Sequence, residues 1–345
     1  MIKKMIAAAA LSTSLTGFSA IAQTNSTMDF YAGKRIDFYI SSTTGGGYDV
    51  TGRHIARHLG RNIPGNPTVT PRNLPGGGGL IMANHLTNIV AKDGLSIGIV
   101  LSSAPFEPLY GNKEAKFDPA RLNWLGSPTK DVATLLVWHE VPVETLEDAR
   151  RVGLTLAVSG GLNSTPAFFG RLLANIFDLK VKLVAGYPGQ NEAFLAMERG
   201  EVQGFPSVSL SSLKSSRPQW LQENKVKPLV YFGGAENAAF ANVPFAASVL
   251  KSNPAKAVLM ELGVAPLAVG RPVFAPPDIP VERADILRSA MWRTFADPEY
   301  LSECEKQNLE CDSPTSGEDL RRIVLEAYAA PKDLVDKINA INTAQ

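Results

Sequence analysis

A glycine-rich turn near the start of the chain is the strongest candidate for a ligand-binding site. The run ISSTTGGGYD at 40–49 follows a short β-type run and precedes a helical pattern over 50–61. Glycine lets the backbone come close to a ligand, and the free N–H groups at a helix start attract anions. Asp49 is expected to cap this helix. Walker A and G-x-G-x-x-G motifs are absent, so the turn predicts either a small-anion site or a turn needed only for tight packing.

A second turn of the same kind occurs in the middle of the chain. The run SGGLNSTP at 159–166 also follows a β-type run, with Thr165 expected to be the N-cap of a helix and Pro166 its first residue. Ligands of α/β proteins bind outside the carboxyl ends of the strands. If the two turns face each other, they can hold one carboxylate from both sides without Arg or Lys.

Several other residues are weaker candidates for the same site. Tyr187 in the run AGYPGQ at 185–190 is expected either to line the pocket or to cover the core. Phe205 and Ser207 follow a further β-type run, and Ser103 is also assigned to the site. The run PGGGG at 75–79 precedes a helical pattern, and we expect it to be a structural turn.

Catalytic and metal-binding patterns are weak. His54 and His58 are four residues apart, a spacing compatible with metal binding, but no H-E-x-x-H motif is present. Arginines alternate with them, so we expect a solvated helical face. His85 and His139 stand alone, and no serine lies in a G-x-S-x-G motif. The sequence therefore predicts no catalytic residue, metal or cofactor.

Short β-type runs alternate with helical patterns, which predicts an α/β fold with mainly parallel central sheets. Within 165–177 the apolar residues Phe169, Leu172 and Ile176 share one helical face, which should pack on a sheet. From Val281 onward the chain is expected to be nearly all helical, with a capping signal at Ser316. The expected strands are 36–41, 68–72, 96–101, 135–138, 154–158, 181–184, 202–205, 228–232 and 267–274.

Two turn-rich stretches, 126–131 and 233–244, suggest that the chain passes between two lobes twice. Residues 23–127 and 246–345 would form one lobe and residues 128–245 the other, joined by paired linkers as a hinge requires. Residues 1–22 have two lysines, an apolar run and an A-I-A ending, which is typical of a cleavable secretory signal. We therefore expect the mature chain to be periplasmic.

Charge and cysteine content limit the possible partners. Removal of residues 1–22 takes away Lys3 and Lys4 and no acidic residue, which changes the formal charge from +1 to −1. This balance offers no electrostatic surface for nucleic acid or an anionic membrane. Cys304 and Cys311 are the two cysteines, and secretion favours a disulfide between them, with two buried free thiols as the alternative.

The run GGGYDVTGRHIARHLGRNIPGNPTVTPRNLPGGGGLIMANHL, followed by AKDGLSIGI, resembles the receptor proteins of tripartite tricarboxylate transporters, often called Bug proteins. The likeness extends from about Asp29 to the C-terminal helices and includes an AGYPG segment. It implies a two-lobed type II periplasmic binding-protein (Venus flytrap) fold and delivery of the ligand to integral membrane permease subunits. The ligands known in the family are di- and tricarboxylates, acidic amino acids and aromatic acids.

The resemblance also implies which residues contact the ligand. In the family, the loops matching Thr43–Asp49 and Gly161–Thr165 hold one carboxylate through amides, hydroxyls and ordered waters. This chain departs from the usual pattern, with Ser42, Thr43 and Thr44 where prolines are common before the glycines. Asn163 and Ala167 replace the second Gly and the His of the second loop. Phe168, Phe169, Tyr187 and Phe205 would suit an aromatic carboxylate, although helical periodicity assigns Phe169 to the core.

The sequence thus predicts a monomeric receptor for a small carboxylate, either a di- or tricarboxylate or an aromatic acid, that serves a tripartite transporter. A ligand-sensing partner of a membrane kinase and a periplasmic enzyme acting on a small acid are the alternatives. The expected ligand-binding residues are Thr43, Thr44, Gly45, Gly46, Gly47, Tyr48, Asp49, Ser103, Gly161, Asn163, Ser164, Thr165, Tyr187, Phe205 and Ser207.

Overall fold

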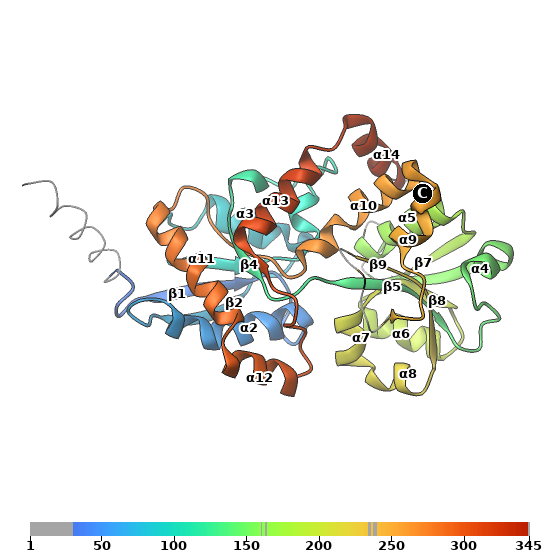
Figure 1. The fold of residues 1–345 in the computed structure, drawn as a ribbon, viewed down its shortest axis with the longest axis horizontal. Helices are drawn as coiled ribbons and strands as arrows, with labels where there is room; N and C mark the ends of the chain where they lie inside the picture. The colour runs from blue at the N-terminus through green and yellow to red at the C-terminus, as the bar shows by residue number, and fades with distance from the viewer. Residues whose placement is uncertain (1–29, 160, 163, 234–235, 237–239, 344–345) are drawn as a thin grey trace, which may run out of the picture.

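Two separate β-sheets organise the chain in a computed structural model, which describes residues 30–159, 161–162, 164–233, 236 and 240–343 (Figure 1). The expected signal segment, Gly160 and Asn163 lie outside these residues. The first sheet has the strand order β11-β4-β10-β3-β1-β2, and the second has the order β7-β6-β8-β5-β9. Helices cover both sheets, which confirms the predicted two-lobed α/β fold.

The strands of the first sheet come from both ends of the chain. They are β1 (Arg35–Ile40), β2 (Thr68–Asn73), β3 (Ser96–Ile99), β4 (Asn123–Ser127), β10 (Val273–Ala275) and β11 (Thr315–Ser316). β1 runs parallel to β2 and β3, whereas β10 and β11 run antiparallel to their neighbours. Strands β4 and β11 were not expected from the sequence.

The second sheet is built from the middle of the chain. Its strands are β5 (Val132–Trp138), β6 (Leu154–Ser159), β7 (Val181–Tyr187), β8 (Gly204–Ser209) and β9 (Val226–Gly233). β6 is parallel to β7 and β8, and β5 is antiparallel to β8 and β9. Both sheets are mixed because β5 and β10, the strands that follow the passages between the sheets, run opposite to their neighbours.

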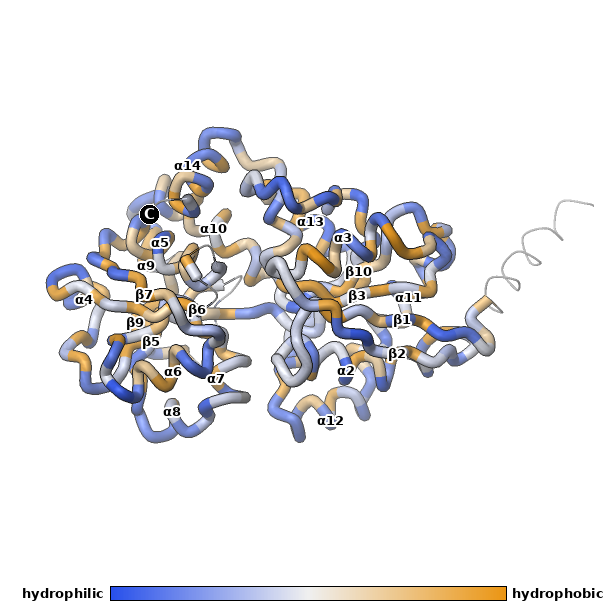
Figure 2. Tube along the Cα trace, turned by 180° about the vertical axis from the view of Figure 1, so that it is seen from behind, coloured by the Kyte–Doolittle hydropathy of each residue, from blue (hydrophilic) through white to orange (hydrophobic). Residues whose placement is uncertain are grey.

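Amphipathic helices bury their apolar faces on these sheets. Phe169, Leu172 and Ile176 of α5 (Thr165–Phe177) are each at most 2% exposed, as their spacing predicts, and α5 packs on β7 and β8. Figure 2 shows hydrophobic residues concentrated along the strands and hydrophilic residues on outer helices such as α12 and α13. The other main helices are α2 (Gly47–Leu59), α3 (Leu80–Asn88), α4 (Leu146–Val152), α6 (Gln190–Glu198), α7 (Leu210–Ser216), α8 (Pro218–Gln222), α11 (Val281–Phe295), α12 (Pro298–Lys306) and α13 (Gly317–Tyr328).

The chain passes from the first sheet to the second between Ser127 and Val132, inside the expected turn at 126–131. It returns by way of α9 (Ala246–Val249) and α10 (Pro254–Val269), which both contact β9, and re-enters the first sheet at β10. The expected strand at 267–274 is therefore wrong in its first half. Residues 267–269 form the end of α10. A short apolar run is compatible with a helix end as well as with a strand, so its hydropathy could not distinguish the two.

The C-terminal helices join the two halves of the molecule. α13 packs on β4 of the first sheet, and α14 (Lys332–Thr343) packs on α5 and α10 (Figure 1). Ser316 caps α13 by accepting a hydrogen bond from Asp319 N at 3.1 Å, which confirms the capping signal. No helix within the described ranges is long and apolar enough to cross a membrane.

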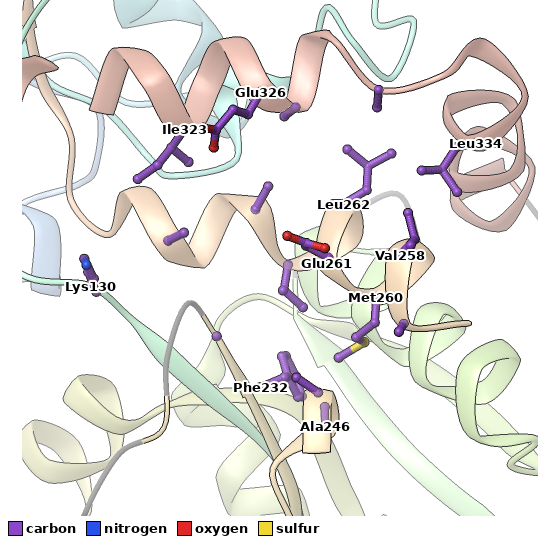
Figure 3. Close-up of a pocket in the computed structure, with 18 of the residues that line it drawn as sticks. Lys130, Phe232, Ala246, Val258, Met260, Glu261, Leu262, Ile323, Glu326 and Leu334 are labelled. Carbon is purple, nitrogen blue, oxygen red and sulfur yellow. The ribbon is translucent and has the colours of Figure 1, made fainter. Parts of the chain in front are cut away.

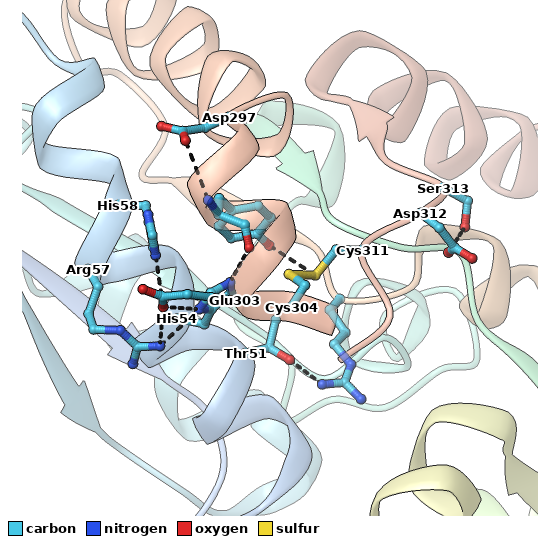
Figure 4. The surroundings of a disulfide bond; sticks show 12 residues. Thr51, His54, Arg57, His58, Asp297, Glu303, Cys304, Cys311, Asp312 and Ser313 are labelled. Atoms are coloured by element: carbon cyan, nitrogen blue, oxygen red, sulfur yellow. Dashed lines mark hydrogen bonds and ion pairs between the residues drawn. A yellow bond between two sulfur atoms is a disulfide. The ribbon is translucent and has the colours of Figure 1, made fainter. Parts of the chain in front are cut away.

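A disulfide joins Cys304 at the end of α12 to Cys311, which confirms the expected pairing (Figure 4). Both cysteines are buried, and the Cys311 sulfur lies 3.5 Å from the hydroxyl of Tyr300. The bridge therefore fixes the segment after α12 against the core of the first lobe.

Replacement of both cysteines by serine should lower the free energy of unfolding by about 2 kcal/mol, because a cross-link over a loop this short removes that much freedom from the unfolded chain. Urea denaturation of the mature protein measures the difference. Wild type unfolded with a reductant present should match the double variant, and the reductant should not affect the variant itself. Equal stability of oxidised wild type and variant would contradict the expectation.

Candidate functional site

The first glycine-rich loop is held in place from beneath by Asp49. This residue is 2% exposed and belongs to the first turn of α2, whose N-cap is Gly46, so its expected capping role is wrong. Asp49 Oδ2 accepts from Gly45 N at 2.8 Å, and Oδ1 accepts from Arg53 Nε at 2.9 Å. Burial acts to raise the pKa of Asp49, but the hydrogen bonds from Arg53, Gly45 and Asn73 together lower it. The Asp49 carboxylate therefore holds the backbone of the loop at Gly45 against the first turn of α2.

Asn73 completes this support, although sequence reasoning missed it. Its side-chain amide donates to Ser42 O at 2.9 Å and to Asp49 Oδ1 at 2.7 Å. Asn73 ends β2 directly beside Ile40, the last residue of β1. The position of Asn73 beside Ile40 depends on the order of the strands in the sheet, which the sequence does not reveal. The loop it supports leaves Thr43, Thr44, Gly45 and Gly47 exposed.

Tyr48 joins the first loop to two other segments. Its hydroxyl accepts from Ser102 N at 3.0 Å and donates to Gly270 O at 3.1 Å. Arg271 lies 8% exposed with its guanidinium 5.3 Å from the Tyr48 ring, and it donates to Gly47 O at 2.6 Å. The start of α2 is therefore fixed to the segment by which the chain re-enters the first sheet.

The second loop presents an uncapped helix start. Ser164, rather than the expected Thr165, is the N-cap of α5 (Thr165–Phe177), and it makes no capping hydrogen bond. Its hydroxyl donates instead to Gly161 O at 2.6 Å. Arg171 holds the loop from behind by donating to Leu162 O at 2.9 Å. The first amides of α5 are thus left without a side-chain acceptor among the described residues.

A crevice of about 390 Å³ opens between the two lobes at this helix start. Ser103, which follows β3, lies on one wall, and Ser164 and Thr165 lie on the other. The structure therefore brings these three expected site residues together. The other residues that line the crevice are Glu107, Tyr110, Gly111, Asn112, Phe168, Phe169, Pro266, Asn342 and Thr343.

The remaining expected residues that the structure describes do not line the crevice. Thr43–Asp49 do not line the crevice in this conformation. The first loop is connected to the crevice wall by the hydrogen bond from Ser102 N to the Tyr48 hydroxyl, because Ser102 directly precedes Ser103. Tyr187 and Ser207 are half-buried at β7 and β8. Phe205 is 1% exposed and packs edge-on to Phe194 at 5.9 Å, so its ring belongs to the core and not to a ligand pocket.

A larger cavity of about 720 Å³ lies between α10, α13, α14 and the end of β9 (Figure 3). Its walls are mainly apolar, and Glu261 and Glu326 project into it. Arg322, also in its lining, is paired with Asp319 and Glu326. Lys130 also lines the cavity, so its acidic and basic side chains balance, but none of the expected site residues that the structure describes lies there. We therefore place the site in the smaller crevice.

The expected solvated face of α2 is wrong. His54 is fully buried and His58 is 2% exposed, because α12 covers this side of the helix. The His54 ring stacks on Tyr300 at 4.4 Å, and burial lowers the pKa of His54. Local sequence patterns do not reveal that α12 covers this face, since α12 lies more than 200 residues further along the chain.

Comparison of the sequence with protein-family models and with curated proteins gave no match. Among solved structures, a TctC solute-binding protein from Polaromonas is similar at 19% identity and a TM-score of 0.67, over 89% of this chain and 99% of that one. MatC from Rhodopseudomonas palustris with bound malate has 18% identity and a TM-score of 0.64, over 89% and 99%. Rpa4515 from R. palustris with adipate has 18% identity and a TM-score of 0.63, over 89% and 97%.

The similarity to these three structures covers 89% of this chain and 97–99% of theirs. The periplasmic binding protein BugD is similar at 16% identity and a TM-score of 0.63, over 90% of this chain and 98% of that one. The resemblance found in the sequence is therefore confirmed at the level of the fold.

Asp131 is an unusual acid in the first passage between the sheets. Its Oδ1 is buried without a hydrogen-bond partner among the described residues. Burial raises the pKa of Asp131 to about 7, against the attraction of Arg271 and with a further contribution from Glu310. A raised carboxyl pKa means that the folded chain holds the proton longer than the unfolded chain, so its stability falls as pH rises from about 4 to about 7.

The Asp131→Asn variant removes this titration and should gain stability relative to wild type as pH rises. Between pH 5 and pH 8 the difference in free energy of unfolding should move in favour of the variant by on the order of 2 kcal/mol. Urea denaturation of both proteins at the two pH values measures it. Other ionisable groups affect both proteins alike, so parallel pH profiles would show that Asp131 titrates normally.

Proposed function

We propose that this chain is a periplasmic solute-binding protein that captures a small carboxylate between its two lobes and passes it to the membrane subunits of a tripartite tricarboxylate-type transporter. The observation that carries the proposal is the crevice between the lobes, with hydroxyls of Ser103, Ser164 and Thr165 at the uncapped start of α5. The fold shared with solute-binding proteins, two of which hold malate and adipate, supports it.

The chemistry of the crevice suits an anion at one end. A helix start carries partial positive charge, and hydrogen bonds from amides and hydroxyls to a carboxylate are charge-assisted. Among the described residues that line the crevice none is Lys or Arg, whereas Glu107 is present and accepts from Asn112 Nδ2 at 2.8 Å. We therefore place the ligand carboxylate at the α5 end, away from Glu107.

Binding is proposed to end with closure of the lobes. The exposed loop at Thr43–Gly47 would then complete the hydrogen bonds to the ligand, and loss of water would strengthen them. We place one hinge segment at 128–131, which follows the lobe boundary at residue 127. The second hinge segment is proposed at 270–272 rather than at 245, because α9 and α10 contact strand β9 of the second sheet.

Release of the ligand unchanged separates a receptor from an enzyme. We propose that the chain binds without turnover, so a ligand incubated with the protein should be recovered intact by mass spectrometry. Loss of the ligand in proportion to protein concentration would favour the alternative that the chain is a periplasmic enzyme acting on a small acid.

A thermal-shift screen over aliphatic and aromatic carboxylates, including malate and adipate, should identify a ligand that raises the melting temperature. Replacement of Ser103 and Thr165 by alanine together should then weaken binding by at least about tenfold, as expected for the loss of hydrogen bonds to a charged group. Isothermal titration calorimetry measures the change, with Ser302→Ala on the exposed face of α12 as the control.

Two outcomes would count against the proposal in different ways. If no carboxylate raises the melting temperature, the proposed ligand class is wrong. If a carboxylate binds wild type and the Ser103/Thr165 variant equally well, the class stands and the crevice is not its site.

A further inference from the structure

Three side chains with metal-binding chemistry meet between α2 and α12 (Figure 4), and none of them lines the crevice. Glu303 Oε2 lies 3.5 Å from His54 Nδ1 and 3.1 Å from His58 Nε2. The three ligand atoms all lie within 4.8 Å of one another. The two histidine side chains are at most 3% exposed, and that of Glu303 is 33% exposed.

We propose that His54, His58 and Glu303 form a binding site for a divalent transition-metal ion, with Zn²⁺ as its best fit. Two imidazoles and one carboxylate are a known zinc ligand set that leaves a fourth position open. Tetrahedral zinc with bonds of about 2.0–2.1 Å places its ligand atoms about 3.3 Å apart. The observed separations of 3.1 and 3.5 Å lie on either side of this value.

The surroundings of His54 already hold its ring in the orientation that a metal requires. Its Nε2 lies 3.0 Å from Tyr300 O, so Nε2 carries the proton and donates to that carbonyl. Metal-bound histidines commonly donate their second N–H to a backbone carbonyl in this way. Tyr300 also stacks on the ring, and the Cys304–Cys311 disulfide fixes the end of α12 next to Glu303.

A cationic group now lies against two of the three proposed ligand atoms. Arg57 Nη2 lies 2.9 Å from His54 Nδ1 and 3.2 Å from Glu303 Oε2. The side chain of Arg57 is 50% exposed, and an exposed ion pair of this kind is weak. A metal ion can therefore displace the guanidinium into solvent, and Arg57 should compete with the metal.

Arg61 also disfavours metal binding, through its hydrogen bond to His58. Its Nη2 donates to His58 Nδ1 at 2.7 Å, which leaves the proton of His58 on Nε2, facing Glu303. Coordination through Nε2 requires that proton to move to Nδ1, and Arg61 must then turn away. Arg61 already pairs with Asp297 at 2.7 Å and with Glu299, so it keeps carboxylate partners after that shift.

An ion at this site would join two distant parts of the chain. α2 starts at the first glycine-rich loop, and α12 lies in the C-terminal part that completes the same lobe. The metal would therefore clamp the helix that presents the loop, without contact with the crevice. Carboxylate binding at the crevice is a separate measurement and does not decide this proposal.

The test uses the mature chain without an affinity tag, with its disulfide intact and metal removed by chelation. Calorimetric titration with ZnCl₂ should show one ion per chain, and Co²⁺ should give the visible absorption of a tetrahedral site. Glu303→Gln should weaken Zn²⁺ binding by at least about tenfold, whereas His139→Ala, an exposed histidine elsewhere, should leave it unchanged.

The Arg57→Ala variant gives a readout that a purely structural role would not produce. Removal of the competing guanidinium should tighten Zn²⁺ binding by about tenfold, while loss of an ordinary structural ion pair would leave it unchanged or weaker. Glu303 and Arg57 are partly exposed, so these variants should fold even if a histidine variant does not. Absence of saturable Zn²⁺ binding, or equal affinity in wild type and Glu303→Gln, would overturn the proposal.

Discussion

The buried guanidinium of Arg271 is the constraint on which the arrangement of the first lobe depends. It bonds Gly47 O and the side chain of Thr51, both in α2, while Tyr48 donates back to Gly270 O. A buried charge that loses its partners is strongly destabilising. The first loop and Arg271 should therefore move as one body, so bending within the second hinge segment must occur at Gly270, next to the end of α10.

An ion pair connects the two lobes in the observed conformation. Lys214 on α7 lies 3.5 Å from Glu310, which follows α12, and in Figure 1 these two helices face each other across the lobes. Burial raises the pKa of Glu310, which Lys214 partly offsets. Opening of the lobes would separate this pair and hydrate both charges, so the ion pair adds little net preference for either state.

The fold was predictable from local patterns, whereas much of the site was not. Alternating apolar runs and the face of α5 indicated the two sheets, and glycine-rich turns indicated where helices start. The roles of Asn73 and Arg271 could not be recognised from the sequence. They depend on the order of the strands and on where the chain re-enters the first sheet. The opposite error concerns Phe205 and His54, which were expected at the ligand site and on a solvated helical face but are both buried. The pattern of a strand end or a helix face does not reveal which distant helices cover it.

One arginine supports each of the two loops through a backbone carbonyl. Arg271 donates to Gly47 O in the first loop, and Arg171 donates to Leu162 O in the second. Each bond occupies a carbonyl oxygen that would otherwise repel an anion, and the backbone amides stay available to bind one. A carboxylate held by amides and hydroxyls needs no buried ion pair, whose rupture would be costly. In the proposed function, such an arrangement would bind a carboxylate without preventing its release to a membrane partner.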